Sequence, residues 1–156
     1  INQLSLDINI LQSKISPAHM EAIHGRLWES NNVEDMNKYH QIRKIDPLEE
    51  ALKKYSINCW VSGVRAQQTE NRSKMKFIEL IRDRLSLRPI LGWTQKEIFY
   101  YMEKHKLPQH PLFAKGYSSI GDWHSSSAET ENTQGRATRF GGIKQECGLH
   151  VNDYQI

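Results

Sequence analysis

The chain has 156 residues, of which 38% are hydrophobic and 25% are charged, and its net charge is +3. This composition is that of an ordinary globular domain large enough for one hydrophobic core. It excludes a membrane-spanning chain, because no apolar run approaches roughly 18 residues, and a disulfide-rich scaffold or four-cysteine metal site, because Cys59 and Cys147 are the only cysteines.

The first half of the chain predicts a strand followed by two helices. Residues 6–12 alternate apolar and polar side chains, which is typical of a strand. Ser16 and Pro17 then form a helix start, since serine caps a first turn and proline tolerates its first position. Asp46 and Pro47 repeat this pattern and predict a second helix start.

Residues 58–64, NCWVSGV, predict a buried strand. Gly63 and Arg65 follow at its carboxyl end, where ligands bind in open α/β sheets. Cys59 lies inside this apolar run, so we expect it to be a small buried residue without a chemical role.

The second half predicts two short strands, a helix and a polar tail. The strands are FIELI and LSLRPI, residues 77–81 and 85–90, and the helix starts at a capping box of Thr94 and Glu97. From His124 the composition becomes polar and then glycine-rich, which indicates a flexible linker and tail. We therefore expect an α/β domain over residues 1–123 and a mobile tail over residues 124–156.

A basic stretch lies between Arg65 and Arg88, with seven basic residues against three acidic ones. Such a stretch suits a phosphorylated ligand or nucleic acid, although a solvated basic face has the same composition.

Cys147 stands in the polar, glycine-flanked stretch KQECGLH. A thiolate nucleophile needs nearby positive charge, which Lys144 and His150 supply locally, while the adjacent carboxylate of Glu146 is predicted to tune its ionisation. A lone tail thiol without a role fits the same residues. A metal site from Cys147, His150, His124 and His110 is the third reading, but no paired ligand motif accompanies it.

Five segments resemble the assimilatory sulfonucleotide reductases, the phosphoadenylyl-sulfate (PAPS) reductase family, in that family's order and spacing. They are HGRLWE (24–29), KIDPLEEAL (44–52), WVSGVRAQQTENR (60–72), HPLFAKGYSSIGDWHS (110–125) and TRFGGIKQECGLH (138–150). The resemblance implies a three-layer α/β sandwich of the adenine-nucleotide hydrolase (PP-loop) type with a flexible, cysteine-bearing tail.

The resemblance also implies a reaction. Cys147 would attack the sulfur of PAPS to form an S-sulfocysteine, which thioredoxin or glutaredoxin would then reduce to release sulfite. The substrate-binding residues it implies are Gly63, Arg65, Arg72, Tyr117, Lys144, His150 and Arg26. The lack of a long apolar run and of a signal-peptide core predicts the cytoplasm and no membrane partner. We expect no nucleic-acid partner, and family members suggest, by analogy alone, a homodimer.

Two departures from the family pattern matter. Relatives that act on adenylyl sulfate (APS) carry an iron–sulfur cluster on two cysteine pairs, and those places here read Tyr39-His40 and Gly121-Asp122-Trp123. We therefore expect no iron–sulfur cluster and a preference for PAPS. The family's phosphate loop is also absent from these residues, so we expect this chain to be a fragment or a processed chain.

Two other functions remain open at this point. One is a nucleotide- or nucleic-acid-binding relative without reductase activity, which the basic stretch and the missing loop favour. The other is an interaction module that docks thioredoxin-like proteins through its tail.

Overall fold

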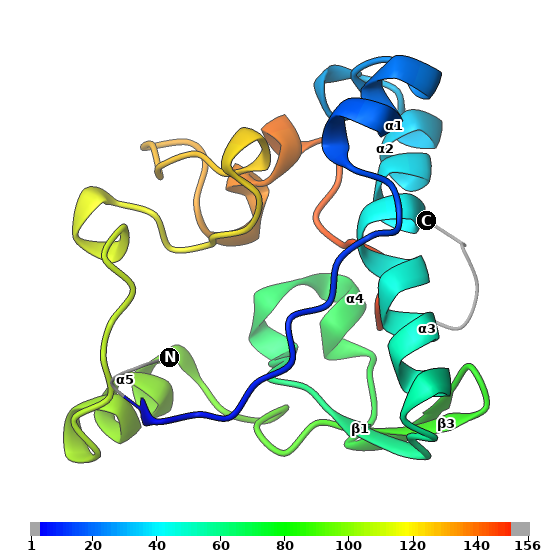
Figure 1. Cartoon of the computed structure of the whole chain (residues 1–156). Coiled ribbons are helices and arrows are strands. Elements are labelled where there is room, and N and C mark those ends of the chain that lie inside the picture. The colour runs from blue at the N-terminus through cyan, green and yellow to red at the C-terminus, as the bar shows by residue number, and fades with distance from the viewer. Residues whose placement is uncertain (1–3, 151–156) are drawn as a thin grey trace.

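The computed structural model describes residues 4–150 (Figure 1). Its helices are α1 (Pro17–His24), α2 (Val33–His40), α3 (Asp46–Lys54), α4 (Glu70–Ser73) and α5 (Gln95–Lys104), and its strands are β1 (Cys59–Val61), β2 (Ile78–Ile81) and β3 (Arg84–Leu87). Short 3₁₀ turns span Leu27–Glu29, Ala66–Gln68, Phe113–Lys115, Trp123–Ser125, Gly135–Thr138 and Phe140–Gly142. Within residues 4–150, no helix is both long and apolar enough to cross a membrane.

The sheet has the strand order β1-β3-β2, with β1 parallel to β3 and β2 antiparallel to β3. The strands predicted at residues 77–81 and 85–90 are thus confirmed as a hairpin, and α/β is the observed class. Trp60 of β1 pairs with Ser86 of β3, and Ser86 is fully buried on the face that the tail covers.

The opposite face of the sheet is exposed, and it overturns one prediction. Because side chains alternate along a strand, Cys59, Val61 and Leu85 point to this face, and Val61 is 64% exposed. Cys59 is likewise exposed. The prediction of a buried strand and a buried Cys59 was therefore wrong, because the apolar run at 58–64 indicated burial without showing that only one face is covered.

Helices α2 and α3 form one continuous rod along one side of the molecule (Figure 1). A π-helical turn, Gln41–Ile45, joins them. This turn is wider than an α-helical turn and lies just before Pro47. In an ordinary α-helix, a proline lacks the N–H for the backbone hydrogen bond, and its ring clashes with the carbonyl four residues earlier. The prediction that Asp46 caps a new helix was wrong: the backbone at 45 and 46 is already helical, and the Asp46 carboxylate accepts a hydrogen bond from Gln41.

The main hydrophobic core lies between α1, α2 and a residue from far along the chain. Met20, Leu27, Met36 and Tyr39 are buried against Phe140. The predicted start of α1 is confirmed, since the Ser16 side chain accepts a hydrogen bond from the His19 N–H at 3.1 Å. The core therefore ties the segment after residue 123 to the amino-terminal helices.

Phe140 also begins the turn that redirects the chain into the tail. Phe140, Gly141 and Gly142 have φ values of 48°, 61° and 84°. This left-handed region is unfavourable for phenylalanine and easy for glycine. Burial of the Phe140 ring, which meets the His40 ring edge-on at 4.8 Å, holds the unfavourable residue in place.

One further sequence prediction differs from the structure, and the predicted linker has local structure. Residues 6–12 form no strand but an exposed, extended segment without a partner strand in the described chain. Residues 124–139 contain two 3₁₀ turns and a bridge between Ser126 and Arg139, and Ser125 and Thr138 are buried. The polar composition thus reflects side chains that bond to backbone, such as Ser127 to the Thr138 carbonyl at 2.8 Å. Whether the tail detaches stays a prediction, and residues 151–156 lie outside the described part.

Helix α5 begins as predicted. The Thr94 hydroxyl accepts from the Glu97 N–H at 3.1 Å, and the Glu97 carboxylate accepts from the Thr94 N–H at 2.7 Å. This reciprocal capping box satisfies two amides that the first turn leaves free.

We predict that Met20→Ala lowers the free energy of unfolding by about 2–5 kcal/mol, because Met20 is 1% exposed and its loss leaves a cavity. Urea denaturation would measure this change. Ile23→Ala on the same helix is the matched control: Ile23 is 56% exposed, so its effect should stay near 0.5 kcal/mol or below. Equal effects of the two substitutions would contradict the assignment of the core.

Candidate functional site

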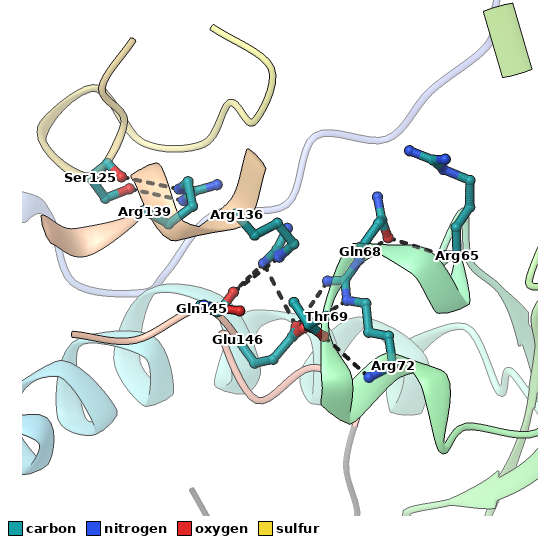
Figure 2. Close-up of polar contacts among 9 residues, drawn as sticks. All are labelled: Arg65, Gln68, Thr69, Arg72, Ser125, Arg136, Arg139, Gln145 and Glu146. Carbon is teal, nitrogen blue, oxygen red and sulfur yellow. Dashed lines mark hydrogen bonds and ion pairs between the residues drawn. The ribbon is translucent and has the colours of Figure 1, made fainter. Parts of the chain in front are cut away.

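The tail is anchored to α4 by a buried ion pair. Arg72 donates from Nε to Glu146 Oε1 at 2.8 Å and from Nη2 to Oε2 at 2.9 Å (Figure 2). Thr69 Oγ1 donates to the same Oε1 at 2.8 Å. Burial alone would raise the pKa of the Glu146 carboxyl, but Arg72, Arg136 and Thr69 outweigh it and lower that pKa below its ordinary value. Glu146 is therefore ionised at neutral pH.

Further contacts tie the tail to three other elements. Lys144 donates to the Asn37 side chain on α2. Arg82, in the β2–β3 turn, donates to the Gly148 carbonyl at 2.6 Å. His150 stacks on Trp60 of β1, with ring centroids 5.3 Å apart and planes 5° apart. Residues 144–150 thus lie along the body of the protein.

Cys147 lies in the middle of this segment, half-buried. Burial lowers the pKa of Arg136, Arg139 and Lys144, and the charge of the Cys147 thiol acts on all three in the opposite direction. The thiol is therefore within electrostatic reach of three cations. Two of them, Arg136 and Arg139, come from the segment that precedes the tail.

A polar cavity of about 570 Å³ opens beside the tail. Its walls come from the segment after β1, from the start of α5 and from residues 113–119 and 129–145. The lining residues that matter here are Arg65, Gln68, Ser119, Glu129, Arg136 and Gln145. Arg136 also donates to the Gln145 carbonyl. The tail thus contributes to the cavity wall.

Arg65 is the cavity-lining cation whose side chain is available to bind a ligand. Its guanidinium has no hydrogen-bond or ion-pair partner among residues 4–150, and Figure 2 shows it pointing away from Arg72 and Glu146. Burial, and then the charge of Arg72, lower the pKa of Arg65. A half-buried guanidinium with its donors free is suited to phosphate or sulfate oxygens.

The other predicted binding residues lie in different surroundings. Lys144 is buried against Asn37, and Arg72 is occupied by Glu146. Gly63 is exposed near Ile90. The roles of these residues in binding stay predictions.

Tyr117 and Arg26 lie apart from the cavity lining. Tyr117 is not among the lining residues, although its neighbours Ser118 and Ser119 are. Arg26 is exposed and pairs with Glu21 at 2.8 Å and with Glu29 at 3.3 Å. Their predicted roles in binding are likewise untested.

The segments at the family's cluster positions meet in space, but their side chains do not fit an iron–sulfur cluster. Tyr39 donates to Asp122 Oδ2 at 3.0 Å, and Lys44 pairs with the same oxygen at 2.8 Å. Cluster irons are bound by thiolates, and no cysteine stands at these positions. Phenol, carboxylate and ammonium groups satisfy one another there instead.

A metal site at the tail has no support in the described residues. Within residues 4–150, no group of three or more histidine, cysteine, aspartate or glutamate side chains is arranged to hold a metal ion. The His150 ring stacks on Trp60 instead.

Sequence reasoning missed the anchoring role of Glu146 and the cavity lining by Gln68 and Glu129. Glu146 and Arg72 are 74 residues apart, and no local pattern links them. The only sequence signal for the position of Arg72 was Thr69, which caps α4 and so makes Arg72 the third residue of that helix.

Three comparisons with known proteins agree with one another. Residues 2–128 match the family model described as "Phosphoadenosine phosphosulfate reductase domain". A protein named phosphoadenosine 5'-phosphosulfate reductase from a Synechococcus strain is 51% identical over 150 residues, covering 96% of this chain and 65% of the relative. A protein of the same name from a Synechocystis strain is 44% identical, covering 96% of this chain and 60% of the relative. The chain thus spans about three-fifths of the length of these curated relatives.

The fold matches as well. A crystal structure of phosphoadenylyl-sulfate (PAPS) reductase from Candida auris, in complex with phosphate, superposes with a TM-score of 0.61 at 25% identity. The match covers 76% of this chain and 57% of that one. The α/β fold class expected from the resemblance is thereby confirmed.

We predict that His150 makes stability depend on pH. Burial, followed by the charges of Arg72 and Arg88, lowers the pKa of His150 from 6.5 to about 4. The unfolded chain therefore binds more protons between these values, and stability should fall as pH drops from about 6.5 to about 4. The measurement is urea denaturation at several pH values across this window.

The variant His150→Gln should show a smaller fall than the wild type over the same window. His19→Gln, at an exposed position, should keep the wild-type slope. If the His150→Gln and wild-type curves run parallel, the histidine is not buried as a neutral ring.

Proposed function

Because the chain belongs to the phosphoadenosine phosphosulfate reductase domain family, we propose that it carries the cysteine-bearing part of an enzyme that reduces PAPS. The products are sulfite and adenosine 3',5'-bisphosphate. The observation that carries the proposal is the docked tail: Arg136 donates to the carbonyl of Gln145, two residues before Cys147, and both Arg136 and Gln145 line the cavity with Arg65.

The proposed chemistry has two steps. The Cys147 thiolate attacks the sulfur of the sulfo group, an S–O bond breaks, and adenosine 3',5'-bisphosphate leaves with the electron pair. The cysteine then carries a sulfonate as S-sulfocysteine. A thiolate of a dithiol carrier attacks the Cys147 sulfur and expels sulfite, and the carrier's second thiol resolves the mixed disulfide, so the carrier supplies both electrons.

The cations around the thiol suit a substrate of this charge. Arg136 lines the cavity, and Arg139 is held by the Ser125 carbonyl at 3.0 Å and the Ser125 hydroxyl at 2.9 Å. Arg65 offers a free fork of donors. Buried guanidinium groups bind anhydride and phosphate oxygens strongly because they are weakly hydrated and form paired hydrogen bonds.

We further propose thioredoxin or glutaredoxin as the carrier, no iron–sulfur cluster, and the cytoplasm as compartment. The carrier reaction needs a reduced thiol pool, which the cytoplasm maintains. The hydrogen-bonded Tyr39, Lys44 and Asp122 support an enzyme without a cluster, because they bind one another at the family's cluster positions.

Intact-protein mass spectrometry tests this function directly. Reduced protein incubated with PAPS should gain one sulfonate on Cys147, thioredoxin should remove it, and APS should give less adduct. Cys147→Ser should abolish the adduct, whereas Cys59→Ser, at the exposed second cysteine, should keep it. Nucleotide binding with no adduct would favour a binding protein over a reductase.

We predict that Arg65→Gln weakens binding of adenosine 3',5'-bisphosphate by roughly 10- to 100-fold, the range expected for lost hydrogen bonds to a charged group. Isothermal titration calorimetry would measure this. Gln67→Ala, which alters a neutral residue of the same cavity, is the control and should bind almost as the wild type does. Unchanged affinity for Arg65→Gln would place the nucleotide elsewhere.

A further inference from the structure

Glu146 is buried in a site built for a carboxylate. It is 7% exposed, and Arg72 is 6% exposed. Both carboxylate oxygens accept from the Arg72 guanidinium, and Oε1 accepts from Thr69 as well. Arg136 lies 3.7 Å from Oε2. Such a paired arrangement is geometrically specific, since two parallel N–H···O bonds fix both distance and plane.

The partners of Glu146 are themselves held in place. The third Arg72 nitrogen, Nη1, donates to Gln68 Oε1. The Gln68 oxygen also accepts from the Arg65 N–H at 3.0 Å. Thr69 caps α4 by accepting from the Arg72 N–H at 3.1 Å. The carboxylate thus docks against side chains of residues 68–72 that also hydrogen-bond to one another.

Cys147 follows Glu146 directly, so the ion pair acts on the thiol through one peptide link. On the preceding side, Arg136 holds the Gln145 carbonyl. On the following side, Arg82 holds the Gly148 carbonyl. The backbone of Cys147 is therefore held on both sides, and within residues 4–150 no hydrogen bond engages its sulfur.

We propose that Glu146 is a positioning residue for Cys147: its carboxylate, held by Arg72 and Thr69, locks the tail and so fixes Cys147 two residues beyond Gln145, which lines the cavity with Arg136. As an inference about catalysis, this rests on the function proposed above. As an inference about the tail, it stands on the contacts alone. Glu146 does not line the Arg65 cavity, so it acts through the position of its neighbour.

While the tail is docked, the guanidinium of Arg72 is fully occupied by hydrogen bonds to other side chains of the protein. All three of its guanidinium nitrogens donate to Glu146 or Gln68. A substrate anion therefore meets Arg65 and Arg136 in the docked state, and Arg72 is available to it only after Glu146 has left.

Thiol alkylation tests the lock without requiring enzymatic activity. Iodoacetamide would be added to the reduced chain, and the rates at Cys147 and Cys59 would be followed by peptide mass spectrometry. Cys59 is exposed and points to the sheet face opposite Trp60, on which His150 of the tail stacks, so it serves as an internal reference. Glu146→Gln should raise the Cys147 rate about tenfold or more, because it leaves Arg72 as an unpaired buried charge, and the Cys59 rate should not change.

Matched variants distinguish loss of the Glu146–Arg72 ion pair from general destabilisation of the fold. Glu70→Gln removes an exposed carboxylate on α4 whose one ion-pair partner among residues 4–150 is Lys74, at 2.8 Å, and it should leave both rates unchanged. Arg72→Lys keeps the charge but loses the paired hydrogen bonds, and it should give an intermediate Cys147 rate. Circular dichroism at the temperature of the assay would establish that each variant is folded, and only folded variants would be compared.

A second measurement concerns the reaction. With PAPS, folded Glu146→Gln should form the Cys147 adduct at least tenfold more slowly, while its affinity for adenosine 3',5'-bisphosphate stays that of the wild type. Equal Cys147 alkylation in wild type and Glu146→Gln would overturn the lock. Faster alkylation together with no adduct even in the full-length wild-type protein, phosphate loop included, would leave the lock standing and overturn the reductase function instead.

Discussion

The pairing of Glu146 with Arg72 is the interaction on which the arrangement of the site depends. It joins residues 74 positions apart and brings the tail onto α4, and from this follow the position of Cys147 and the tail side of the cavity wall. A buried pair of this kind gains little net free energy, because desolvation of two charges offsets their attraction. Its value is geometric: two parallel hydrogen bonds fix both the distance and the plane of the paired groups.

Sequence patterns whose residues lie close together in the chain predicted the structure correctly. Patterns whose outcome depends on distant residues did not. The caps at Ser16 and Thr94 involve residues three positions apart, and both formed as expected. Asp46 carries the same signal, yet it lies inside a rod because α2 continues through a π-helical turn into it. An isolated helix-start pattern cannot reveal that a helix is already in progress.

The sequence could not predict which residues are buried or which distant side chains pair with one another. The apolar run around Cys59 predicted a strand correctly, but its burial depends on which face of the sheet is covered. The cysteine itself, Cys147, was identifiable because the surrounding motif resembles a family with a known reactive cysteine. Its neighbour Glu146 was assigned only an electrostatic effect on the thiol, because nothing near it in sequence shows that Arg72 neutralises its charge.

The contacts of the tail have an order along the chain, and this order has a mechanical consequence. Towards the carboxyl end they are a stacked ring at His150 and a single backbone hydrogen bond at Gly148. Towards the amino end, beyond the ion pair, the Phe140 ring is embedded in the core. We expect a tail attached in this way to open from the His150 side and to pivot at the glycines after Phe140. Cys147 directly follows Glu146, so opening as far as the ion pair would uncover its thiol while the pair still held the rest of the tail.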